Sequence, residues 1–225
     1  MYLIVTRTFP PELGGMQSLM WGLSRELSKN FMVKVFADYI EGHKDFDNQA
    51  SFSIERVGGI KLLRKYRKAQ LINQFIKDNR IEGIIADHWK SLELIKTTKK
   101  KYCLIHSKEI NHPKGSSLNK RVLNVLNNVE KVIANSQFTK NLATECGVNE
   151  NNIIVINPGI DPAKELEKKT MNKVESLLNV KTPRLITVSR FDKRKNHEKV
   201  IMALRNLKQI YPDIVYICIG YGEEE

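Results

Sequence analysis

The chain has 225 residues, of which 41% are hydrophobic, so it is long enough for one sizeable core and a second, smaller one. No apolar run approaches the roughly 20 residues that a membrane-spanning helix needs, and the first residues lack the length and flanks of a signal peptide, which predicts a cytoplasmic protein. The net charge of +12 favours a polyanionic partner such as a lipid surface, a nucleic acid or a diphosphate ligand.

From the N-terminus onward, short runs rich in β-branched and aromatic residues alternate with longer segments of helical period. This alternation predicts βαβ units, and runs that are apolar almost throughout suit parallel strands buried on both faces. The runs are residues 2–5, 32–37, 52–57, 83–86, 102–106, 131–134 and 153–156. The helical segments are residues 16–29, 61–79, 90–98, 117–129 and 137–146. We therefore expect a doubly wound α/β domain over residues 1–160.

Asn157-Pro158-Gly159 interrupts this pattern, because proline lacks a backbone donor and disfavours helix in the residue before it. We place a hinge there. A charged helical segment follows at 162–178, and then a strand at 185–188, a helix at 197–210 and a strand at 214–219 are expected. Two strands and one crossover helix do not make a stable doubly wound sheet. Residues 161–225 are therefore predicted to be the first βαβ of a second, incomplete Rossmann-like domain.

The connection between the first strand and the first helix, residues 6–17, is long and ends on two glycines. Gly14 and Gly15 lie where the helix begins, so their amides and the helix N-terminus are suited to a phosphate or another anion. A glycine turn that only reverses the chain is the alternative. The segment matches neither Gly-x-Gly-x-x-Gly nor a Walker loop, which removes support for dehydrogenases and NTPases.

His106 is predicted to end a strand, with Glu109 in the loop after it, at the carboxyl edge where open α/β sheets bind ligands. A histidine there can donate to a substrate hydroxyl or a developing charge, and Glu109 could orient it or an acceptor. The alternative is a structural histidine with satisfied hydrogen bonds. His88, beside Trp89, occupies a similar position, and packing against the tryptophan is its favoured interpretation.

Arg190 and Lys195 belong to a loop with four cations, which follows the strand 185–188 and precedes a helix. Cations placed there are suited to neutralise a diphosphate leaving group. A solvated basic loop is the alternative.

The helix expected at 61–79 combines apolar residues with a cluster of Lys and Arg, which is typical of a surface that touches anionic lipid. A helix packed on the core with a solvated face is the more usual cause of such a pattern. Asp45-Phe46-Asp47 has the spacing of a metal-binding acidic pair but lacks supporting context, and the three cysteines have no metal or redox spacing. The sequence predicts no metal site.

Six segments, spread through almost the whole chain, carry a resemblance to one enzyme family. They are FPPELGGMQ at 9–17, HSKE at 106–109, VIANSQFTKNLATECGV at 132–148, IIVINPGID at 153–161, LITVSRFDKRKNHEKVIMAL at 185–204 and IGYG at 219–222. In order and spacing they resemble the retaining GT-B glycosyltransferases of family four (glycosyltransferase group 1). The opening segment most resembles mannosyltransferases that act on phosphatidylinositol mannosides, and it also resembles many enzymes of lipopolysaccharide and capsule assembly.

Three departures from the family pattern are visible. Ser107 replaces the glycine of His-Gly-x-Glu, and Pro158 replaces the asparagine of Asn-Gly-Val-Asp, where Ile160 also stands for valine; both changes look mild. The pair of glutamates that holds the donor in the family would lie beyond Glu225, so the chain as given is expected to be truncated in the donor domain.

The resemblance implies transfer of a hexose from a nucleotide-diphosphate sugar to a lipid-linked or polysaccharide acceptor, with retention of configuration and without a metal or other cofactor. It implies GDP-mannose as a plausible donor, with UDP-sugars close behind, and an acceptor that places the enzyme peripherally on the inner membrane. The implied catalytic residues are His106, Arg190 and Lys195. The implied donor- and acceptor-binding residues are Gly14, Gly15, Glu109, Ser189, Gly220 and Gly222.

Three other functions remain open at this point. The first is an inactive, truncated transferase that binds an acceptor or a partner. The second is a sugar-nucleotide epimerase of the same overall fold, which no residue in the sequence supports. The third is a nucleic-acid binder, which only the net charge of +12 suggests; because no nucleic-acid signature is present, no nucleic acid is expected as a partner.

Overall fold

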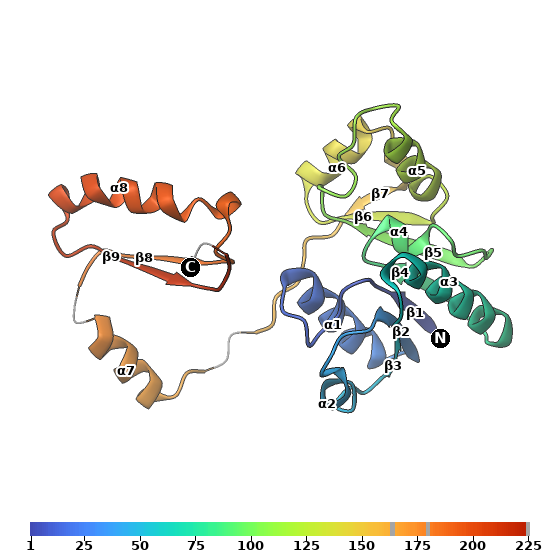
Figure 1. Cartoon of the computed structure of the whole chain (residues 1–225), viewed down its shortest axis with the longest axis horizontal. Coiled ribbons are helices and arrows are strands. Elements are labelled where there is room, and N and C mark those ends of the chain that lie inside the picture. The colour runs from blue at the N-terminus through green and yellow to red at the C-terminus, as the bar shows by residue number, and fades with distance from the viewer. Residues whose placement is uncertain (163–164, 179–180, 224–225) are drawn as a thin grey trace. The chain divides into compact units, whose positions relative to one another are not determined.

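The computed structural model describes residues 1–162, 165–178 and 181–223. The chain divides into two compact units, Met1–Asp161 and Pro162–Glu225, called unit 1 and unit 2 below (Figure 1). Each unit contains a parallel sheet with helices, which confirms the predicted α/β class. Within the described residues, none of the helices has both the length and the apolar character needed to cross a membrane.

Unit 1 is built on a seven-stranded parallel sheet in the order β3-β2-β1-β4-β5-β6-β7. The strands are β1 Tyr2–Val5, β2 Val33–Asp38, β3 Ser53–Val57, β4 Gly83–Ala86, β5 Lys100–Ile105, β6 Lys131–Ala134 and β7 Ile153–Val155. The strand order reverses between β1 and β4, so this is the point where the loops after the two strands diverge and leave room for a ligand.

Helices cover both faces of this sheet. They are α1 Gly15–Ser28, α2 His43–Asp47, α3 Lys61–Asp78, α4 Trp89–Leu92, α5 Ser117–Leu126 and α6 Gln137–Glu145, with a 3₁₀ turn η1 at Glu150–Asn152. Alternate residues of β1 point into two separate cores: Leu3 packs in one cluster and Ile4 in the other. The nearly continuous apolar character of the strands follows from this two-sided burial.

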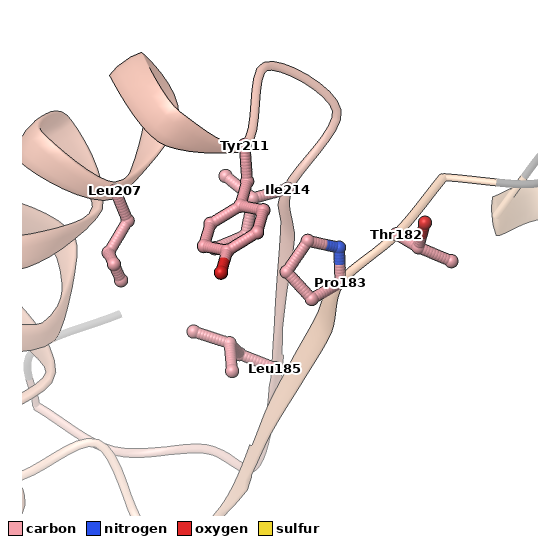
Figure 2. Close-up of a pocket in the computed structure, with 6 residues that line it drawn as sticks. All are labelled: Thr182, Pro183, Leu185, Leu207, Tyr211 and Ile214. Atoms are coloured by element: carbon pink, nitrogen blue, oxygen red, sulfur yellow. The ribbon is translucent and has the colours of Figure 1, made fainter.

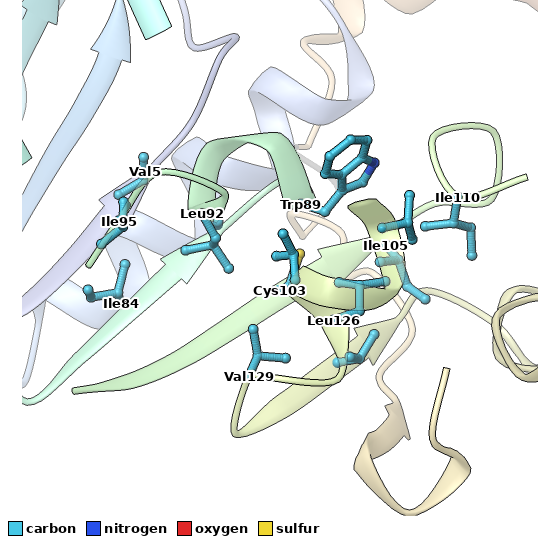
Figure 3. Close-up of a cluster of buried hydrophobic side chains, with 14 of the residues drawn as sticks. Val5, Ile84, Trp89, Leu92, Ile95, Cys103, Ile105, Ile110, Leu126 and Val129 are labelled. Atoms are coloured by element: carbon cyan, nitrogen blue, oxygen red, sulfur yellow. The ribbon is translucent and has the colours of Figure 1, made fainter. Parts of the chain in front are cut away.

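The larger core cluster packs against the middle strands of the sheet and reaches residues that follow β4 and β5, such as Trp89 and Ile110 (Figure 3). Trp89 is fully buried in it, and its indole Nε1 donates to the Glu109 backbone oxygen at 2.8 Å. Burying one large aromatic side chain contributes about 1.5–3 kcal/mol. Because Trp89 begins α4 after β4 and Glu109 lies in the loop after β5, this bond ties the segments that follow two neighbouring strands to the core.

Unit 2 contains α7 Lys168–Leu178, β8 Arg184–Val188, a 3₁₀ turn η2 at Lys193–Lys195, α8 His197–Ile210 and β9 Val215–Ile219. β8 and β9 form a two-stranded parallel sheet, and α8 covers one of its faces. On the other face Ile186 is 60%, Val188 70% and Ile219 50% exposed.

Element boundaries agree with the sequence expectations within one or two residues for most strands, but two expectations were wrong and one element was missed. The helix expected at 90–98 ends at Leu92, because the Asn73 side chain in α3 binds the backbone oxygen of Leu94 and the amide of Lys96. β5 starts at Lys100 and ends at Ile105, so His106 follows the strand. The short helix α2 had no sequence signal long enough to reveal it.

Candidate functional site

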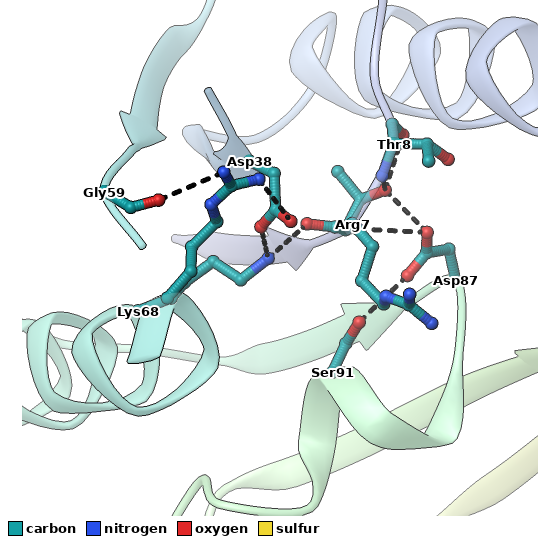
Figure 4. A network of polar contacts seen from close by, with 9 residues as sticks. Arg7, Thr8, Asp38, Gly59, Lys68, Asp87 and Ser91 are labelled. Atoms are coloured by element: carbon teal, nitrogen blue, oxygen red, sulfur yellow. Dashed lines mark hydrogen bonds and ion pairs between the residues drawn. The ribbon is translucent and has the colours of Figure 1, made fainter. Parts of the chain in front are cut away.

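A buried carboxylate organises the carboxyl edge of unit 1 at the reversal of strand order. Asp87, directly after β4, accepts from the Thr6 hydroxyl at 2.6 Å, the Arg7 amide at 3.2 Å and the Ser91 hydroxyl at 3.1 Å (Figure 4). Burial raises the pKa of Asp87, while these hydrogen bonds and the charge of Lys68 act in the opposite direction.

Lys68 in α3 links this carboxylate network to the next strand. Its Nζ donates to the Thr6 backbone oxygen at 2.7 Å and to Asp38 Oδ1 at 2.6 Å, although the residue is only 5% exposed (Figure 4). Arg64 adds a 3.5 Å contact to Asp38. α3 is therefore fixed over the carboxyl ends of β1 and β2. Sequence reasoning missed this network, although Thr6, Asp38 and Asp87 are all polar residues at strand ends, which was an available signal.

His106 lies directly after β5, and its imidazole Nε2 is buried without a hydrogen-bond partner among the described residues. Burial lowers the pKa of His106, and the charges of Glu109 and Asp87 partly oppose that effect. Glu109 accepts from the His106 backbone amide. The Glu109 carboxylate thus holds the loop backbone, and the imidazole is left with an open hydrogen-bonding position.

Ser107, in the same loop, has a backbone φ of 98°. This lies in the region that favours glycine, because a side chain there crowds the backbone. Ser107 stands where the resembled family has glycine, so the expectation that this departure is mild was wrong. The serine stores strain beside His106.

His88, after β4, is half-buried beside Trp89, with ring centroids 5.6 Å apart. Its Nδ1 accepts from the Lys90 amide at 3.0 Å. Burial, followed by the positive charges of Arg7 and Lys90, lowers the pKa of His88 to about 3. The structure thus agrees with the packing interpretation and adds that His88 is uncharged at neutral pH.

Gly14 is the N-cap residue of α1 and Gly15 is the first residue of that helix. Gly14 has an extended φ of 161° and a Cβ there would meet the flexible end of Gln17, whereas a Cβ on Gly15 would meet nothing within 4 Å. Neither backbone conformation requires glycine. No side chain in the described chain caps this helix, so its first amides stay open to a ligand.

The candidate residues of unit 2 lie at the carboxyl end of β8. The Ser189 hydroxyl is 3.0 Å from His197 Nε2. Arg190 is directed to solvent, 64% exposed, with its Nη2 3.9 Å from Asp192 Oδ2. Lys195 ends η2 and is exposed. Asp192 also lies 3.5 Å from Arg194, so one carboxylate offsets part of the charge of this basic loop.

Gly220 and Gly222 have a structural role next to this loop. The Ser189 amide donates to the Ile219 oxygen at 3.0 Å and the Phe191 amide to the Tyr221 oxygen at 2.9 Å. A Cβ on Gly220 would lie 1.8 Å from the Ser189 oxygen, and one on Gly222 would lie 2.2 Å from the Phe191 oxygen. Glycine at both positions lets the chain after β9 approach the segment that carries Arg190.

Two other features lie away from these candidates. A hollow of about 480 Å³ in unit 2 is lined by Pro183, Leu207 and Tyr211 and lies at the amino ends of β8 and β9, opposite the basic loop (Figure 2). In unit 1, Asp47 binds Arg56 at 2.7 Å and His43 at 2.8 Å. The Asp47 carboxylate is thus occupied by these two partners within the protein. Among the residues described, no cluster of side chains is suited to a metal ion.

The chain is similar to a known family in sequence and to solved structures in fold. A profile of Glycosyltransferase Family 4 matches residues 13–164. HepE from Anabaena, in complex with UDP and glucose, matches with a TM-score of 0.74 and 19% identity over 98% of this chain and 61% of its own. Its complex with UDP-glucose gives 0.72 at 18% identity, over 98% and 60%. A sucrose-phosphate synthase from Thermosynechococcus elongatus gives 0.66 at 15% identity, over 97% and 70%.

No curated protein sequence matches the chain. At the identities of the solved structures, the likeness establishes the α/β fold of GT-B transferases over part of their length. The chain spans 61% of the length of HepE in its complex with UDP and glucose.

Proposed function

Since the chain belongs to Glycosyltransferase Family 4, we propose that it transfers a hexose from a nucleotide-diphosphate sugar to a lipid-linked or polysaccharide acceptor, with retention of configuration. The observation that carries the proposal is the family match over residues 13–164. The solved complex of HepE with UDP-glucose supports a UDP-hexose as the first donor to test. GDP-mannose, which the sequence motifs favour, is the second.

The basic loop after β8 is proposed to hold the donor diphosphate. Negative charge grows on the leaving diphosphate as its bond to the sugar lengthens, and cations that are already in place stabilise that charge. Arg190 is 64% exposed, and Lys195 has no carboxylate within ion-pair distance among the described residues. Both side chains are therefore available to a ligand. Ser189, Gly220 and Gly222 position the backbone of this loop.

His106 is proposed to hydrogen-bond the reacting sugar or the acceptor hydroxyl. The lowered pKa keeps its imidazole uncharged at neutral pH, so it can donate or accept a single hydrogen bond. The buried Nε2 without a partner supports this role, because an unpaired buried polar atom costs about 1–3 kcal/mol that a ligand can recover. Gly14 and Gly15 are proposed to admit the acceptor at the start of α1.

The first two turns of α3 support an acceptor at a lipid surface. Leu62 is 81%, Leu63 60% and Tyr66 54% exposed, whereas burial in α3 starts only at Lys68. The rest of α3 packs on the core through Ile72, Phe75 and Ile76, as the more usual interpretation of the pattern expects, whereas these first turns leave large apolar side chains exposed. Lys61 and Lys65 lie beside the apolar side chains, a combination suited to anionic lipid. We propose that the protein binds the surface of the inner membrane peripherally through this segment.

The experiment is a transfer assay with radiolabelled UDP-glucose and GDP-mannose in the presence of polar-lipid vesicles. Labelled sugar appearing in the lipid fraction, and lost when Arg190→Ala is used, supports the proposal. Binding of a nucleotide-sugar without any transfer or hydrolysis favours the alternative of a binding module derived from a transferase. No binding of any donor contradicts the donor assignment itself.

A further inference from the structure

Four basic or imidazole side chains meet at the carboxyl ends of three neighbouring strands in unit 1. Arg7 follows β1, His88 and Lys90 follow β4, and His106 follows β5, and the pairings β1–β4 and β4–β5 make these strands adjacent. The Arg7 backbone amide donates to the Asp87 carboxylate. The Arg7 side chain extends toward α4, the helix that carries Lys90 (Figure 4).

The positive charge at this edge is not neutralised by the protein. Neither Arg7 nor Lys90 has a carboxylate within ion-pair distance in residues 1–162, 165–178 and 181–223, and the Lys90 Nζ lies 5.2 Å from the centre of the Trp89 ring. The nearby carboxylates are already engaged: Asp87 by three donors, Glu93 by Arg121 at 2.7 Å, and Glu109 by the backbone amide of His106.

The same edge offers hydrogen-bonding capacity that the protein leaves unused. His106 Nε2 is buried without a partner among the described residues, and His88 is half-buried within reach of the charges of Arg7 and Lys90. Cations on the same edge as a buried, unpaired imidazole nitrogen fit a ligand that carries both an anionic group and a hydroxyl. A phosphate attached to a sugar or polyol has this arrangement, and cations bind phosphate through strong, charge-assisted hydrogen bonds.

We propose that the edge formed by Arg7, His88 and Lys90 is a phosphate subsite, and that it selects acceptors that carry a phosphate or phosphodiester in addition to the hydroxyl that receives the sugar. The inference rests on the proposed function, because it assigns the acceptor class of that site. Arg7 and Lys90 hold the phosphate, and the acceptor hydroxyl lies at His106 Nε2. An uncharged glycan acceptor leaves both cations without a partner.

The test is a titration of the full chain with inorganic phosphate, in which NMR of ¹³C-labelled histidine reports the pKa of His88. A bound anion favours the protonated imidazole, so phosphate is expected to raise the pKa of His88 from about 3. Arg7→Gln and Lys90→Gln should each weaken phosphate binding about tenfold or more, which corresponds to about 1.4 kcal/mol. Lys120→Gln, an exposed lysine in α5, is the matched control and should leave binding unchanged.

Glycerol 3-phosphate, a fragment of lipid headgroups, is titrated in parallel. Tighter binding than inorganic phosphate, with the same loss in both variants, assigns the subsite to a lipid headgroup; equal binding assigns it to any phosphate. A His88 signal that does not respond, or responds equally in wild type and Arg7→Gln, overturns the subsite. UDP-glucose binding is measured in the same variants, so that loss of the subsite with intact donor binding leaves the proposed function standing.

Discussion

In unit 1 the candidate residues rest on a sheet covered on both faces, whereas in unit 2 they rest on two strands and one helix. All the buried hydrophobic residues described in the chain lie in unit 1, from Leu3 to Ile153. Unit 1 fixes its polar groups with buried side-chain hydrogen bonds around Asp87. Unit 2 fixes its basic loop with backbone hydrogen bonds to the chain after β9.

The difference indicates how each unit will respond to change. A buried side-chain network is sensitive to the charge of its members, because its groups are isolated from water. A loop held by close backbone approach is sensitive to added volume at the glycines that permit it. Four variants, one in unit 2 and three in unit 1, probe this contrast.

The largest expected effect is that of Gly220→Ala in unit 2. The new Cβ would lie 1.8 Å from the Ser189 oxygen, so the chain after β9 has to move away. We expect the loss of the Ser189 and Phe191 amide hydrogen bonds, at a cost of about 3 kcal/mol. Hydrogen exchange of these two amides measures it. Gly15→Ala is the control, since nothing lies within 4 Å of its Cβ, and it should gain about 0.5–1 kcal/mol. Unchanged exchange in Gly220→Ala would disprove the backbone account.

The double variant Leu62→Ser/Leu63→Ser tests the exposed start of α3. These leucines contribute little to the fold because they are 81% and 60% exposed, but full burial of one leucine is worth about 1.5–3 kcal/mol. We expect binding to vesicles with anionic lipid to fall about tenfold or more, as measured by flotation, with the thermal midpoint unchanged. Leu118→Ser, an exposed leucine in α5, is the matched control. Equal flotation of the two variants would rule out α3 as the docking segment.

A smaller effect, specific to unit 1, is expected for Asp87→Asn. Burial raises the pKa of Asp87, so the folded chain binds a proton at a pH where the unfolded chain does not. The stability that this extra proton contributes is fully present below the ordinary pKa of 3.8, and it is lost as the pH rises through the pKa that Asp87 has in the folded chain. Wild type should therefore gain stability relative to Asp87→Asn as the pH is lowered from neutrality. Urea unfolding at several pH values measures this, and a constant difference contradicts a raised pKa.

The smallest effect is expected for Ser107→Gly. Relief of the strained φ of 98° outweighs the extra freedom of glycine in the unfolded chain. The net gain in the free energy of unfolding should be about 0.5–1 kcal/mol. Urea unfolding of this variant beside Ser116→Gly, which removes the N-cap of α5 and should not stabilise, provides the comparison. A loss of stability in Ser107→Gly would show that the serine side chain makes a contact worth more than the strain.

The sequence was sufficient for the sheet and most of its strands, because strands buried on both faces leave short runs that are apolar almost throughout, such as 131–134, between longer segments of helical period. It was also sufficient for the place of the basic loop, since Arg190 and Lys195 follow a strand and precede a helix. The short α4 could not be predicted in the same way, because a side chain from α3, Asn73, ends it.

The polar network of unit 1 depends on contacts between residues far apart in the chain. Thr6 and Asp87 are 81 positions apart, and Lys68 is 62 positions from Thr6, so no local spacing in the sequence predicts these two hydrogen bonds. Similarly, the roles of Gly220 and Gly222 depend on a backbone approach to Ser189 and Phe191 that only the folded chain reveals. Local patterns therefore placed the candidate loops at the ends of strands, and tertiary contacts decide what each side chain in them touches.

Calorimetric titration of the chain with UDP-glucose and GDP-mannose tests the central claim most directly. If the basic loop of unit 2 binds the donor diphosphate, Arg190→Ala and Lys195→Ala should each weaken binding about tenfold or more, because a hydrogen bond to a charged group is worth about 1.5–3 kcal/mol. Lys208→Ala, an exposed lysine near the far end of α8, should bind as wild type does. Equal affinities in wild type, Arg190→Ala and Lys195→Ala would contradict the account.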